Sequence, residues 1–185
     1  MIARNDSRPV PPRLVCIDPG STASGVVVYD GAIPSGPVVL ARKIENDDLL
    51  ACLRIKRFNT SDVDLSGPHV LVVEMIASYG MPVGAEVFET CVHIGRCLEA
   101  WSGEAVRVYR KDVKLALCGT YRANDATIRQ AILDRFGGKA VAVGKKASPG
   151  PLYGVKADAW GALAVGLVHT ERGGSRAATN DRKEA

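Results

Sequence analysis

The sequence predicts an α/β fold in which helices flank a mixed five-stranded sheet. Three apolar stretches, at 14–17, 25–29 and 36–43, follow one another with only short turn segments between them, which indicates an antiparallel meander. Two more apolar stretches, at 69–74 and 105–109, are separated from the meander and from each other by segments with helical spacing. The 185 residues are enough for one domain with a substantial core. We expect a flexible leader at 1–12, one domain at 13–170 and a disordered tail at 171–185.

The first strand delivers a carboxylate into a tight turn. Leu14–Ile17 is a short apolar run, typical of a strand that is buried on both faces, and Pro19 and Gly20 end it after Asp18. An acid at the end of a buried strand is costly unless a cation or hydrogen-bond donors meet it there. Asp18 is therefore the first candidate site residue, and the alternative is a carboxylate that caps the turn through its own backbone.

The strand His69–Glu74 has the same form as the first strand, because it is also a continuous apolar run that ends in an acid. Before it we expect a helix at Glu45–Arg57 and a loop at Asn59–Gly67. Two adjacent strands that each end in a carboxylate would bring both acids to one edge of the sheet, where charge repulsion favours a bound cation. The alternative for Glu74 is a simple ion pair with an arginine.

A helix is predicted from Gly84 to Trp101, with apolar residues at helical spacing that serve either the core or a subunit interface. His93 lies off this stripe and is expected at the surface, and Glu86 and Glu89 are expected to be exposed rather than to approach a metal. The next expected helices are Arg110–Leu117, which Gly119 ends, and Ala126–Phe136. Asn124 or Asp125 caps the second of these helices, and glycines 137 and 138 terminate it.

The segment Lys139–Gly154 is rich in lysine, proline and glycine and is expected to be a basic, flexible loop whose lysines suit phosphate contacts. The last element, Val155–Thr170, carries small residues that allow a helix to pack closely on a sheet, with Asp158 in its first turn. The helix dipole alone is the alternative reason for an acid at that place. His169 would lie about 16 Å along the helix from Asp158 and should not share a metal with it.

Composition narrows the classes of function. The net charge of +4 is unevenly distributed, since residues 41–106 hold six basic and ten acidic residues whereas residues 107–156 hold eleven basic and three acidic ones. This asymmetry favours a polyanionic partner, with a solvated basic face as the alternative. The five cysteines form no CxxC pair, which favours reduced thiols in a cytoplasmic protein over disulfides or structural zinc. No run of about 18 uncharged apolar residues occurs, so we expect no membrane partner.

Three acids carried on this order of strands and helices resemble the ribonuclease H-like superfamily, and within it the RuvC-like Holliday junction resolvases, in particular the phage type. The resemblance covers most of residues 13–170. The segments that carry it are IDPGSTASG around Asp18, VVE at Glu74, the run with Lys114 and Gly119, and DAWGALAVGLVH from Asp158.

The resemblance implies a homodimer that nicks four-way DNA junctions symmetrically and leaves 5′-phosphate and 3′-hydroxyl ends. Asp18, Glu74 and Asp158 match the acids that bind two Mg²⁺ ions, for which Mn²⁺ can substitute, and Lys114 matches a lysine near the scissile phosphate. The predicted location is the cytoplasm, or the host cytoplasm for a phage protein. The predicted contacts to the DNA backbone are Arg110, Lys111, Lys114, Lys139, Lys145 and Lys146.

The sequence departs from the family pattern at two positions. Cellular members usually carry a further acid where this chain has Gly161, and a second lysine where it has Asp125. Two other interpretations therefore stay open. One is a catalytically inactive junction-binding protein, and the other is an ATP-binding domain of the actin and sugar-kinase type, for which the chain is short and lacks a glycine-rich adenosine motif.

Overall fold

The computed structural model describes residues 13–30, 36–58, 63–78 and 80–180, with side chains as far as residue 173. The leader expected at 1–12 lies outside the described residues. Five strands form one mixed sheet in the order β3-β2-β1-β6-β7, which confirms the predicted fold class. Its strands are β1 Leu14–Asp18, β2 Ala23–Tyr29, β3 Val38–Glu45, β6 Val70–Met75 and β7 Glu104–Tyr109.

The first three strands form the predicted antiparallel meander, and β6 and β7 extend the sheet in parallel with β1. Strands β1 and β6 lie in the interior of the sheet, where both faces are covered, and this explains their uninterrupted apolar sequences. Since β1 and β6 run in the same direction and pair from Leu14 with Val70 to Ile17 with Val73, their C-terminal ends meet at one edge of the sheet.

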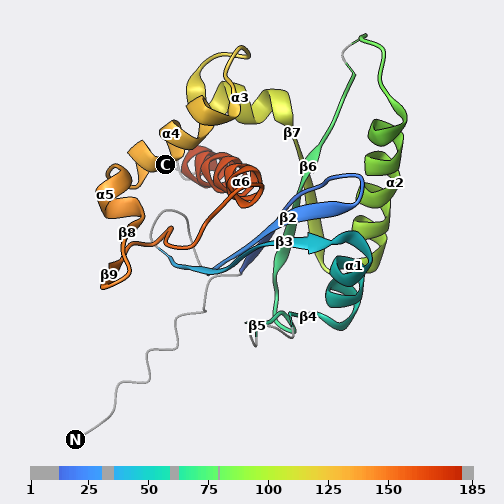
Figure 1. The fold of residues 1–185 in the computed structure, drawn as a ribbon, viewed down its shortest axis with the longest axis horizontal. Coiled ribbons are helices and arrows are strands. Elements are labelled where there is room, and N and C mark those ends of the chain that lie inside the picture. The colour runs from blue at the N-terminus through green and yellow to red at the C-terminus, as the bar shows by residue number, and fades with distance from the viewer. Residues whose placement is uncertain (1–12, 31–35, 59–62, 79, 181–185) are drawn as a thin grey trace, which may run out of the picture.

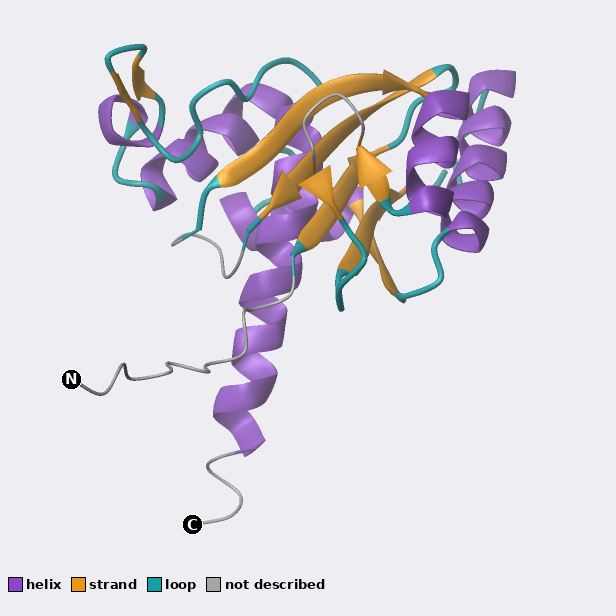
Figure 2. Ribbon diagram, turned by 90° about the horizontal axis from the view of Figure 1, so that it is seen from below, coloured by secondary structure: helices purple, strands orange, loops and turns teal. Residues whose placement is uncertain are grey.

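Helices cover both faces of the sheet (Figures 1 and 2). One face packs against α1 Asn46–Ile55 and α2 Ala85–Ala100 through a core that includes Leu49, Leu53 and Ile94. The other face packs against α3 Arg110–Cys118, α4 Asp125–Arg135 and α6 Ala159–Asn180. The contact with α6 is close because its first turns are built from small residues, as the sequence predicts.

The helix boundaries follow the predicted capping residues. Asn124 rather than Asp125 caps α4, because its side chain accepts a hydrogen bond of 2.9 Å from the Thr127 amide. Gly119 ends α3 in the left-handed conformation at φ 69°. No helix in the described part of the chain is long and apolar enough to span a membrane.

Three segments differ from the sequence prediction. The segment 139–154 is ordered as a short helix, α5 Lys139–Ala142, and a hairpin, β8 Gly144–Lys145 with β9 Ser148–Pro149, because the fully buried Leu152 and Ala142 anchor it to the core. The segment expected to be a loop at 59–67 contains part of a second hairpin, β4 Arg57–Phe58 with β5 Val63–Asp64. Helix α6 continues past Thr170 to Asn180, and residues 181–185 lie outside the described part.

The prediction that His93 lies at the surface is wrong. His93 is 3% exposed and its Nε2 lies 3.1 Å from the Ser24 hydroxyl, which donates a hydrogen bond to Asn46 Oδ1. The Asn46 amide in turn donates to the carbonyl of Gly20, in the turn that follows Asp18. His93 is off the apolar stripe in sequence, but it faces the sheet, where this polar network takes up its Nε2 while its Nδ1 is buried without a hydrogen-bond partner among the described residues.

Candidate active site

The ends of β1 and β6 bring two acids together. Asp18 is the last residue of β1, and Glu74 follows Val73, the partner of Ile17, so the two carboxyl groups lie on neighbouring parallel strands and share a hydrogen bond. Glu74 is only 4% exposed. The sequence prediction that repeated strand-plus-acid segments converge at one edge of the sheet therefore describes the geometry correctly.

The third acid, Asp158, reaches the same place because two glycines allow α6 to approach. Gly25 is the cross-strand partner of Asp18, and a Cβ atom at Gly25 would lie 2.4 Å from the Asp158 carbonyl oxygen. A Cβ atom at Gly161 would lie 2.0 Å from Oδ2 of Asp18. The first turn of α6 therefore rests directly against Asp18. A side chain at Gly25 would meet the Asp158 backbone, and one at Gly161 would require the Asp18 carboxyl group to move.

The electrostatics of the site reflect this crowding of acids. Burial, followed by the neighbouring Glu74, raises the pKa of Asp18 to about 8, and Asp158 adds to the rise. Arg110 opposes the rise. Glu74 and Asp158 therefore lie close enough to disfavour the charged form of Asp18, in addition to the larger effect of burial.

Arg110 is the basic group at the β6 side of the site. Its Nη1 donates to Glu74 Oε1 at 3.1 Å, and its Nη2 donates to Asp125. The ion pair with an arginine, which the sequence left open as the alternative for Glu74, is therefore present. Asp125, which stands where the resemblance leads one to expect a lysine, holds Arg110 from the outer side.

Lys43 is the basic group at the opposite side of the site, and sequence reasoning missed it. Its ammonium lies 2.8 Å from Oδ2 of Asp158. Lys43 in β3 pairs with Gly25, and Gly25 pairs with Asp18, so the three residues form one row across the sheet. The pairing register of the three meander strands could have predicted this contact, because it places Lys43 in the same cross-strand row as Asp18.

The other predicted DNA contacts fall into two groups. Lys111 and Lys114 lie on α3 beside Arg110, and together with Tyr121 these residues line a cavity of about 270 Å³. Arg110 also lines the acid pocket of about 210 Å³, which contains Asp18, Asp158 and Gly161, so the two cavities adjoin.

Lys139, Lys145 and Lys146 form the second group, and the structure does not bring them to the acids. They belong to α5 and the β8–β9 hairpin. The chain after this hairpin joins β3 at its far end, where the Val38 amide donates to the Pro151 carbonyl, whereas Lys43 marks the end of β3 beside the acids. Figure 1 places the hairpin at the margin of the molecule.

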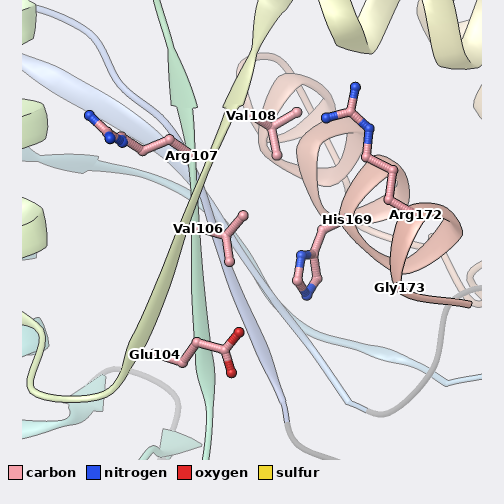
Figure 3. A pocket seen from close by; sticks show the side chains of 7 residues that line it. All are labelled: Glu104, Val106, Arg107, Val108, His169, Arg172 and Gly173. Atoms are coloured by element: carbon pink, nitrogen blue, oxygen red, sulfur yellow. The ribbon is translucent and has the colours of Figure 1, made fainter. Parts of the chain in front are cut away.

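Another cavity, of about 510 Å³, is separate from the acids. Figure 3 shows His169 on α6 pointing toward Val106 and Glu104 of β7, with Arg172 one turn further along the helix. His169 thus lines a different cavity from Asp158, in agreement with the distance predicted along the helix.

The residues present fit a divalent cation, although among the described residues no three acids, histidines or cysteines are already arranged as a metal site. Asp18, Glu74 and Asp158 offer carboxylate oxygens, the ligands that Mg²⁺ prefers. Repulsion by Glu74 and Asp158 adds to the effect of burial on the pKa of Asp18, and a bound cation would relieve this repulsion. Two of the three acids are bound by Arg110 and Lys43. A metal at this site would therefore replace a basic side chain on Asp158.

No protein-family model matches this chain, and no curated protein matches it by sequence. Among solved structures it is similar to RuvC of Thermus thermophilus in complex with a Holliday junction substrate, with a TM-score of 0.56 and 18% identity over 85% of this chain and 92% of that chain. A second structure of Thermus thermophilus RuvC gives a TM-score of 0.55 at 18% identity over the same shares of the two chains.

These similarities define the class of the fold. The mixed five-stranded sheet with flanking helices is the ribonuclease H-like fold in the form that RuvC has. The predicted origin in a phage is not tested by either comparison and stays a prediction.

Proposed function

We propose that this protein is a metal-dependent, structure-selective DNA endonuclease that nicks four-way junctions and leaves 5′-phosphate and 3′-hydroxyl ends. The observation that carries the proposal is the convergence of Asp18, Glu74 and Asp158 at the carboxyl ends of β1 and β6. The similar RuvC structure was solved with a Holliday junction substrate, which supports branched DNA as the substrate class.

In this proposal the three acids hold two Mg²⁺ ions, for which Mn²⁺ can substitute. The ions would activate a water molecule for attack and stabilise the leaving 3′ oxygen. The protein's own contribution is position, because β1, β6 and α6 fix the three carboxylates from separate rigid elements. Lys114, in the cavity that adjoins the acids, would stabilise developing charge on the phosphate.

The proposal includes a homodimer formed through α2. This helix exposes apolar side chains on the face away from the sheet, with Phe88 62% and Val92 60% exposed and Cys91 exposed between them. Large exposed apolar groups at helical spacing favour a helix-to-helix contact. A symmetric dimer would present one acid site to each of two strands of a junction.

The inactive junction-binding protein remains the second candidate, because Gly161 and Asp125 stand where cellular relatives carry an acid and a lysine. The packing at Gly161 argues against the loss of a metal ligand from an inactivated site, because the carboxyl group of Asp18 fills the space in which a side chain at position 161 would begin. The ATP-binding alternative requires a second domain, and the described residues form their helices around one five-stranded sheet.

The decisive experiment is cleavage of a labelled synthetic four-way junction, with linear duplex as the substrate control. Wild type and Asp18→Asn are each assayed with Mg²⁺ and with chelator, and Asp134→Asn, an exposed acid on α4, is the variant control. We expect paired nicks that need both the metal and Asp18. If the protein binds the junction tightly but makes no cut with Mg²⁺ or Mn²⁺, the nuclease proposal is wrong and the junction-binding protein is the better interpretation.

A further inference from the structure

We propose that Lys43 is the second basic group of this active site and that it exchanges partners, from the Asp158 carboxylate to a DNA phosphate when Asp158 binds the metal. The inference rests on the proposed function.

The position of Lys43 is set by the sheet. Lys43 stands in the edge strand β3, in one cross-strand row with Gly25 and Asp18. Arg110 reaches the acids from the β7 side and Lys43 from the β3 side, so the two basic groups flank the acid cluster. Removal of either group leaves one side of the cluster without its own cation.

The contact of Lys43 makes it a competitor of the metal. Its ammonium lies 2.8 Å from Oδ2 of Asp158, and a positive charge this close opposes the approach of a cation to the same oxygen. The Lys43 side chain is 60% exposed, so it can swing outward when the oxygen is taken. Its flexible four-carbon stem keeps the displaced ammonium within reach of a phosphate group beside the acids.

Arg110 is less suited to such an exchange. It is 29% exposed, and it is held at two ends by Glu74 and Asp125. A guanidinium fixed by two carboxylates stays in place, whereas the single ion pair of Lys43 is weak and exposed to solvent. Lys43 is therefore the group that can change partner.

The test compares Lys43→Met and Lys43→Arg with Arg42→Met. Arg42 is the neighbouring exposed residue of β3, and the alternation of a strand places it on the opposite face of the sheet. Two quantities are measured for each protein. The first is the Mg²⁺ affinity of the DNA-free protein by calorimetry, and the second is the single-turnover rate of junction cleavage at saturating Mg²⁺.

We expect Lys43→Met to bind Mg²⁺ about two- to five-fold more tightly than wild type, as removal of one solvent-exposed ion pair allows. The same variant should cleave at least about ten-fold more slowly even when metal is saturating, because the phosphate loses a cationic partner. Lys43→Arg should retain most of the cleavage rate, and Arg42→Met should change neither quantity.

Two results would overturn the inference. Weaker Mg²⁺ binding by Lys43→Met would mean that Lys43 only orients Asp158 as a ligand, and unchanged cleavage would mean that it never reaches the phosphate. If wild type itself makes no cut, the proposed function fails. In that case the Mg²⁺ affinities still decide whether Lys43 competes for Asp158.

Discussion

Asp18 lies among two other carboxyl groups, and its titration should be visible in the stability of the protein. Burial and the nearby Glu74 raise its pKa from 3.8 to about 8. The folded state therefore retains a proton that the unfolded chain has released, over the range from about pH 4 to about pH 8. Because the folded state binds more protons in this range, stability falls as the pH rises through it.

We predict that Asp18→Asn stabilises the protein in chelator at pH 8, where the charged carboxylate is most unfavourable. The gain in the free energy of unfolding should be on the order of 1 kcal/mol or more, and it should vanish below about pH 4, where both states are protonated. Chemical denaturation at the two ends of this pH range measures it. Asp134→Asn on the exposed face of α4 is the control and should show no such pH dependence.

Gly161 is a second residue at which a small substitution should have a large effect, because it lies against the Asp18 carboxyl group. A Cβ atom there would lie 2.0 Å from Oδ2 and 2.7 Å from Cγ of Asp18, too close for either group to remain in place. We predict that Gly161→Ala costs about 1–3 kcal/mol of stability. Gly161→Asp should abolish cleavage rather than improve it, although it introduces the acid that the resemblance leads one to expect at this position.

The matched control for Gly161 is Gly173→Ala in the same helix, because among the described residues no atom beyond the helix's own backbone and the neighbours of Gly173 lies within 4 Å of the added methyl group. Gly173→Ala should be neutral or should stabilise by up to about 1 kcal/mol through helix propensity. Thermal unfolding and the junction assay measure both effects. Faster cleavage by Gly161→Asp would show that the site lacks a ligand and that the packing argument is mistaken.

Among the secondary-structure elements, α2 has two faces with different tasks. One face carries Ile94, Cys97 and the buried His93 into the core, and the opposite face exposes Phe88 and Val92. The His93 network connects this helix to the turn after Asp18 through Ser24 and Asn46. These hydrogen bonds therefore join α2 to the turn that follows Asp18.

We predict that Val92→Glu converts the proposed dimer into a monomer, because a buried charge without a partner is costly in an apolar interface. Molar mass from light scattering during size-exclusion chromatography measures the change. Val141→Glu is the control, since Val141 is 61% exposed on α5, outside the proposed interface. If the wild-type protein is monomeric at micromolar concentration, the proposed homodimer is wrong.

Across the molecule as a whole, basic residues occur both beside the acids and far from them. Lys111 and Lys114 line the cavity that adjoins the acid pocket, whereas Lys145 and Lys146 lie in the β8–β9 hairpin, beyond the opposite end of β3. The four arms of a junction extend well beyond one active site. The two groups of lysines should therefore contribute to different steps.

We predict that the double variant Lys145→Gln and Lys146→Gln weakens junction binding and lowers the salt slope of log K by about 1 for each phosphate that is no longer neutralised. Its single-turnover cleavage rate at saturating protein should be unchanged. Lys114→Gln should instead lower that rate. Binding titrations between low and moderate salt, together with single-turnover assays, separate the two effects, and a cleavage defect in the hairpin variant would contradict this assignment.

Much of the fold was predictable because its central strands have a simple sequence pattern, an uninterrupted run of apolar residues. An uninterrupted apolar run such as Leu14–Ile17 is typical of a strand with both faces buried, and the acids Asp18 and Glu74 stand directly at the ends of such runs. Parallel neighbours place these ends side by side. The small residues that follow Asp158 likewise predict a helix that packs closely on the sheet.

Local sequence is thus enough to predict the strands, most helix boundaries and the three acids, since each depends on a local pattern or on the chemistry of one residue. Long-range packing is needed to bring Lys43 to Asp158, to hold Arg110 between Glu74 and Asp125, and to fill the space beside Gly161 with Asp18. It also buries His93 and orders the segment 139–154 around Leu152. These outcomes depend on contacts between residues far apart in the chain, whose distances follow from strand register and helix packing rather than from local sequence.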